Sequence, residues 1–131
     1  MFIDANVYLE FLLKQEKAEK AKTFITKVSN SKGESFISDF NLDSIMIVLY
    51  RNSIPVETME DFLLEVINSS GINVYETTMK DRLEAIKLMQ KYSLDYEDAL
   101  TLQAASATGS KEIVSFDSHF DNIEEIKRIE P

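Results

Sequence analysis

Short apolar runs alternate with stretches of helical periodicity along this chain, and the alternation limits the folds open to it. The runs lie at residues 1–3, 34–38, 72–76 and 112–116, with 126–130 as a candidate fifth strand. The periodicity predicts helices over about 5–14, 15–29, 39–51, 55–68, 79–92 and 95–109. Helices between successive strands imply a parallel sheet covered on both faces. We therefore expect one α/β domain over residues 1–131, with three layers (α/β/α).

The composition fits a packed globular protein. Hydrophobic residues make up 44% of the 131 residues, glycine and proline are few, and cysteine is absent, which excludes disulfides and thiolate chemistry. The net charge of −9 argues against broad attraction to nucleic acids or anionic membranes, unless some acids hold cations. We expect no signal peptide, no membrane helix and a cytoplasmic location.

Two acidic residues directly follow apolar runs at opposite ends of the chain. Asp4 follows the first run and Asp117 follows the fourth. Ligands of open parallel sheets bind beyond the carboxyl ends of the strands, so the two carboxylates would face one crevice if these strands are neighbours. The alternative for Asp4 is a helix N-cap, a common role for aspartate.

Two further acids lie where a purely solvated charge is less expected. Asp98 shares a helix face with Leu102 and Ala105, which suggests close packing toward the sheet. Its alternative is a first-turn position behind an Asp95 N-cap. Asp43 heads an apolar helix row, and its alternative is a contact with the helix dipole.

Four acids in one crevice would repel one another unless they were protonated or bridged by cations. Oxygen ligands favour Mg²⁺ or Mn²⁺ over zinc, and such sites suit phosphodiester hydrolysis. A receiver domain or a haloacid-dehalogenase-type phosphatase fits less well, because "IDAN" lacks the paired acids that each requires.

Four segments together resemble the PIN-domain ribonucleases, including the VapC toxins of VapBC toxin–antitoxin modules. They are "FIDAN", "ISDFNLDSIMIVLYR", "LDYEDALTLQAASA" and "IVSFDSHFDNIEEIKRIEP". The resemblance covers essentially the whole chain in order and spacing. It implies the following site: catalytic acids Asp4, Asp43, Asp98 and Asp117, of which Asp4, Asp98 and Asp117 bind metal, with Asn6 and Ser115 as supporting polar groups.

The second acid departs from the family pattern. That acid is usually Glu in the family, and Asp43 is one methylene shorter, so Asp39, one turn earlier, is the substitute candidate. His119, the only histidine, is expected in a turn without a catalytic role.

The resemblance implies a Mg²⁺- or Mn²⁺-dependent endoribonuclease that acts on RNA, pairs with an antitoxin protein and forms a homodimer. The alternative is not an enzyme but a PIN-like scaffold that has lost activity and serves protein binding. Metal binding together with RNA cleavage would distinguish the two.

Overall fold

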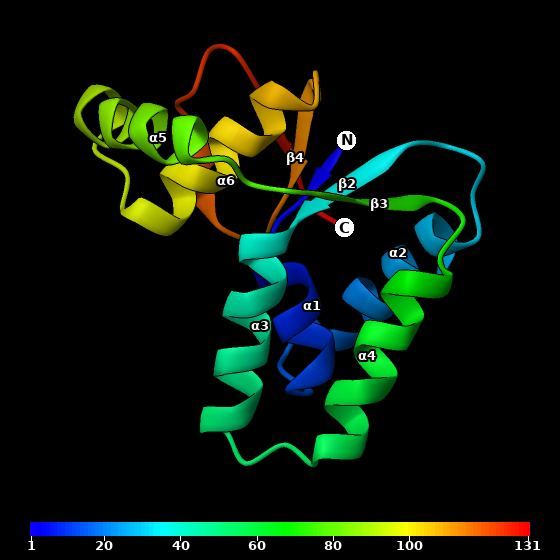
Figure 1. Ribbon diagram of the computed structural model, residues 1–131. Coiled ribbons are helices and arrows are strands. Elements are labelled where there is room, and N and C mark those ends of the chain that lie inside the picture. The colour runs from blue at the N-terminus through cyan, green and yellow to red at the C-terminus, as the bar shows by residue number, and fades with distance from the viewer.

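The computed structural model describes residues 1–131 and has a five-stranded parallel sheet at its centre (Figure 1). The strands are β1 (Phe2–Ile3), β2 (Ser35–Ser38), β3 (Ile72–Tyr75), β4 (Glu112–Val114) and β5 (Lys127–Ile129). Their order in the sheet is β3-β2-β1-β4-β5, so the short first strand lies between β2 and β4. The chain order reverses between β1 and β4, and the residues after both strands therefore meet at one edge of the sheet.

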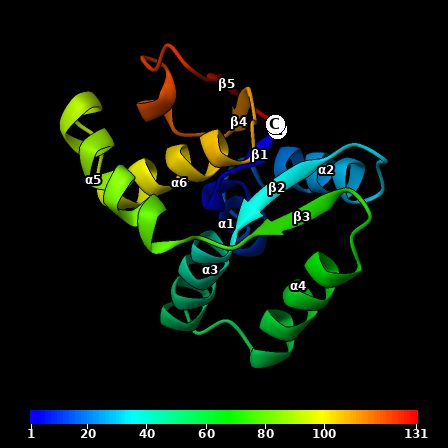
Figure 2. The same ribbon diagram turned by 45° about the horizontal axis from the view of Figure 1, so that its top comes forward.

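Six helices cover the two faces of the sheet, which confirms the predicted three-layer α/β/α architecture (Figure 2). They are α1 (Ala5–Leu12), α2 (Ala18–Ser29), α3 (Asp39–Arg51), α4 (Val56–Asn68), α5 (Met79–Tyr92) and α6 (Tyr96–Ala107). One hydrophobic cluster joins the sheet to α1–α4, and a second joins it to α5 and α6. None of these helices is long and apolar enough to cross a membrane.

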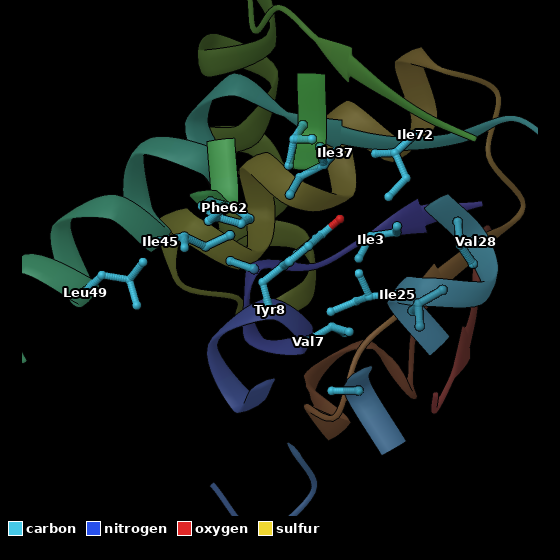
Figure 3. Packing of buried hydrophobic residues seen from close by; sticks show 14 residues of the cluster. Ile3, Val7, Tyr8, Ile25, Val28, Ile37, Ile45, Leu49, Phe62 and Ile72 are labelled. Atoms are coloured by element: carbon cyan, nitrogen blue, oxygen red, sulfur yellow. The ribbon is translucent and has the colours of Figure 1, made fainter. Parts of the chain in front are cut away.

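Alternating side chains of the central strands supply both clusters. Ile3 and Val114 belong to the cluster under α1–α4, whereas Phe2 and Ile113 belong to the cluster under α5 and α6. All four side chains are fully buried, as the two-residue period of a strand covered on both faces requires. Figure 3 shows the first cluster, where Ile3 lies among side chains from the surrounding helices.

Capping residues mark the start of α5 and the end of α6. Thr78 forms a capping box with Asp81 at the start of α5, and Gly109, just after α6, has a φ of +69°. The candidate fifth strand is present as β5. The fourth strand is shorter than predicted and ends at Val114, so Ser115 and Phe116 begin the loop that carries Asp117. Ser115 lies directly after the end of β4, where its backbone N–H still donates to the Ile129 carbonyl of β5.

Candidate metal and active site

Asp4 occupies the N-cap position of α1 but does not use its side chain as a cap. The carboxylate makes no capping hydrogen bond, and Asp4 is only 6% exposed. The Ser115 hydroxyl instead donates to Asp4 Oδ2 at 2.8 Å. The alternative reading of Asp4 as an ordinary N-cap therefore accounts for its backbone position only. Its carboxylate lies beyond the carboxyl end of β1, beside the residues that follow β4.

Ser115 connects the loop after β4 to the start of α1. Its Oγ accepts hydrogen bonds from Asn6 Nδ2 at 2.8 Å and from the backbone N–H of Asp117 at 2.9 Å. Asn6 Oδ1 in turn accepts the backbone N–H of Phe116 at 3.2 Å. Asn6 and Ser115, the two expected supporting groups, thus fix the position of Asp4 relative to Asp117.

The start of α6 brings Asp98 to the same edge. Asp95 is the N-cap of this helix and accepts the backbone N–H of Asp98 at 2.9 Å, as its alternative role predicts. That contact uses only the backbone of Asp98. The Asp98 side chain, 13% exposed, lies 2.8 Å from the Nδ1 atom of His119.

His119 lies in a short 3₁₀ helix, Ser118–Phe120, that follows Asp117. Its Nδ1 atom is 3.3 Å from Asp117 Oδ1 as well as 2.8 Å from Asp98 Oδ2, so the ring bridges the two acids. His119 thus lies in a turn, as predicted, but its bridging position between the two acids was not predicted. The Asp-x-His spacing directly after a strand-end acid was the available signal.

These side chains surround one small cleft of about 190 Å³. Its lining residues are Asp4, Ala5, Asn6, Leu9, Asp95, Glu97, Asp98 and Asp117. The structure thus brings together three of the four predicted acids, and it adds Glu97, which the sequence analysis did not single out.

Burial and mutual repulsion change the titration of these acids. Burial raises the pKa of Asp4 to about 7; the Ser115 hydrogen bond opposes this rise, and the charges of Asp98 and Glu97 add to it. Burial also raises the pKa of Asp98, against the effect of its hydrogen bond with His119. The same hydrogen bond and the charge of Asp117 raise the pKa of His119. Positive charge is therefore favoured in the cleft.

Asp43 and Asp39 do not lie at this cleft. The family resemblance implies that Asp43 is a fourth catalytic acid, but Asp43 is exposed and does not line the cleft. The adjacent Ser44 occupies the side of α3 that meets α6. Asp39 Oδ1 accepts hydrogen bonds from the backbone and hydroxyl of Thr77, which hold the start of α3 against the loop before α5. Asp39 is therefore no substitute for Asp43.

The donor atoms fit a divalent cation. Asp98, Asp117 and His119 each offer one ligand atom, and these atoms lie within 4.8 Å of one another. Asp4 adds a buried carboxylate on the same cleft, and burial raises its pKa. Carboxylate oxygens of this kind suit Mg²⁺ or Mn²⁺.

The fold and this cleft define a parallel α/β protein with a carboxylate cluster at the reversal point of its sheet. The chain belongs to the PIN domain family, a family of nucleases that use divalent metals, because the family model matches residues 1–126. No curated protein matches the chain at the sequence level.

Solved structures with little sequence identity share the fold. VapC20 of Mycobacterium tuberculosis, described as a sarcin-ricin loop cleaving toxin, has a TM-score of 0.75 at 14% identity, over 96% of this chain and 98% of that one. VapBC2 of Rickettsia felis, bound to a promoter DNA fragment, has a TM-score of 0.75 at 11% identity, over 98% and 96%. A toxin–antitoxin complex from Klebsiella pneumoniae has a TM-score of 0.68 at 16% identity, over 95% and 93%.

Proposed function

We propose that this PIN domain is an endoribonuclease that hydrolyses RNA phosphodiester bonds with Mg²⁺ or Mn²⁺ at the cleft of Asp4, Asp98 and Asp117. The observation that carries the proposal is the convergence of these three acids on one cleft, from the position after β1, the first turn of α6 and the loop after β4. When bound, the cation supplies the charge that lowers the pKa of a water molecule and stabilises the leaving oxygen.

The residues of the chain have distinct roles in this proposal. Asp4, Asp98 and Asp117 hold the cation, and Ser115 and Asn6 keep two of these acids in position through the hydrogen bonds described above. The cleft also has to accept a phosphate despite a net charge of −9 on the chain. A bound cation resolves this conflict by making the cleft less negative.

We further propose that the protein is a VapC-like toxin that acts in the cytoplasm, with an antitoxin protein as its partner. Support comes from the toxin–antitoxin complexes among its structural neighbours. We also propose a homodimer. In its support, α3 and α4 form an apolar groove of about 400 Å³, lined by Met46, Tyr50, Val56, Met59, Glu60, Leu63 and Leu64.

Cleavage of structured and unstructured RNAs in the presence of Mg²⁺, Mn²⁺ or EDTA tests the proposal. We expect cleavage with either metal and none in EDTA. Asp4→Asn, Asp98→Asn and Asp117→Asn should each abolish cleavage while the variants remain folded by circular dichroism. Asp61→Asn, on an exposed position of α4, is the control. A folded wild-type protein that binds no divalent metal and cleaves no RNA would favour the inactive scaffold that serves protein binding.

A further inference from the structure

Two polar contacts join α3 to α6, and they lead from the core to the cleft. The Thr101 hydroxyl donates to Asn41 Oδ1 at 3.3 Å, and both residues are fully buried. The second contact lies one turn later on α3 and one turn earlier on α6, where the Ser44 hydroxyl donates to Glu97 Oε1 at 2.5 Å. Residues three or four apart share a helix face, so the first contact fixes the helix pair that presents the second.

The second contact positions a carboxylate at the cleft. Glu97 lines the cleft together with Asp4, Asp98 and Asp117. Ser44 engages only Oε1, and Glu97 has no salt bridge and no other side-chain hydrogen bond, so Oε2 remains free. Glu97 is the only glutamate among the residues that line this cleft.

Asp43 cannot make the same approach from its place on α3. Consecutive residues of a helix point about 100° apart, so Asp43 is turned away from the side on which Ser44 meets Glu97. Asp43 is exposed accordingly. The side of α3 that faces α6 carries a hydroxyl at this level rather than an acid, and the adjacent carboxylate comes from α6.

We propose that Glu97 is the fourth carboxylate of the metal site and that Ser44 is a positioning residue which holds it there. This inference rests on the proposed function, because it assigns a further ligand to the same divalent cation. It transfers to Glu97 the role that the family resemblance implies for Asp43. The Ser44 hydrogen bond occupies Oε1 and leaves Oε2 as the ligand atom.

Binding of Mn²⁺ to the full chain, measured by isothermal titration calorimetry without RNA, tests this assignment. We expect Glu97→Gln to weaken Mn²⁺ binding at least tenfold and Ser44→Ala to weaken it several-fold, whereas Ser44→Thr retains a hydroxyl and restores affinity. Asp43→Asn, the matched control one residue from Ser44, should bind as the wild type does. In the Glu97→Gln background, Ser44→Ala should cause little further loss, because the two residues act as one unit.

The outcomes separate this inference from the proposed function. If Glu97→Gln binds Mn²⁺ like the wild type while Asp117→Asn does not, the three-acid site stands and the role of Glu97 is refuted. A loss of affinity in Asp43→Asn rather than Glu97→Gln would return the fourth position to Asp43. A wild-type protein that binds no Mn²⁺ would overturn both proposals. Melting temperatures in EDTA check that each variant is folded, and Glu97→Gln should melt no lower than the wild type.

Discussion

The Ser115 hydroxyl donates a hydrogen bond to Asp4 Oδ2 at 2.8 Å and thereby joins the ends of the two central strands. Ser115 Oγ also accepts a hydrogen bond from the backbone N–H of Asp117. A single buried side chain therefore sets the relative position of two proposed metal ligands.

Loss of this hydroxyl should weaken metal binding without removing a ligand. We expect Ser115→Ala to lower Mn²⁺ affinity by about 10- to 100-fold, the usual effect of losing a group that orients a ligand. Calorimetric titration measures the change. Ser118→Ala, three residues further on and exposed, is the control and should bind normally. Unchanged affinity in Ser115→Ala would mean that Asp4 is held in place by the backbone alone.

Divalent metal should stabilise the folded protein. A ligand that binds only the folded state at a hundredfold excess over its Kd adds about 2.7 kcal/mol. For a domain of this size that corresponds to a rise of about ten degrees in Tm. Thermal scans with Mn²⁺ and with EDTA measure this rise, which should be much smaller in Asp117→Asn.

The same scans test whether the acids repel one another. Asp117→Asn removes one negative charge, and the amide oxygen can still accept the His119 N–H at the start of the 3₁₀ helix. This variant should therefore melt higher than the wild type in EDTA. Equal metal responses in the two proteins would show that Asp117 is only a turn residue.

His119 should matter more to the metal-free protein than to the reaction. Its ring bridges Asp98 and Asp117, and contact with these acids raises its pKa, so the imidazolium offsets their repulsion. We expect His119→Ala to melt lower than the wild type in EDTA at pH 6, to regain much of the difference in Mn²⁺ and to keep most RNA cleavage. Complete loss of cleavage with metal binding intact would place His119 in the chemistry.

Asp81 should make stability depend on acid pH at a place remote from the cleft. Burial alone would raise the pKa of Asp81, but hydrogen bonds from Thr78, Gln103 and Tyr75 outweigh burial and lower the pKa from 3.8 to about 2. Because the folded pKa is the lower one, the stabilisation is complete above pH 5 or so and is lost as pH falls from about 4 to 2.

Urea unfolding at pH 7 and pH 3 measures this contribution. Asp81→Asn should lower the free energy of unfolding at pH 7 by about 2 kcal/mol and by less at pH 3. Asp61→Asn on the exposed side of α4 is the matched control. An equal loss in Asp81→Asn at both pH values would point to packing rather than charge.

The order of elements and the strand-end acids could be predicted from the sequence because they depend on local patterns. Apolar runs, capping residues and the acids after β1 and β4 are all visible within a few neighbouring positions. The parallel order of the sheet then places Asp4 near Asp117.

The carboxylate that joins Asp4, Asp98 and Asp117 at the cleft could not be predicted in the same way. Which residue of α3 faces α6 depends on the rotation of one helix against another, and Asp43 and Ser44 differ by one position only. The His119 bridge and the Glu97 contact likewise join segments 21 and 53 residues apart. Periodicity within one segment carries no information about such pairs.

The central place of β1 also determines when the cleft can exist. Asp4 and its partner Ser115 are separated by 111 positions, nearly the whole chain, so this contact closes one of the longest loops in the protein. Loop closure of that length comes at an entropic cost that local helices do not bear. A nascent chain on the ribosome lacks Ser115 and Asp117 until synthesis has passed β4. Its acidic residues therefore stay apart until the last strands join the sheet, and an incomplete polypeptide has no assembled cleft.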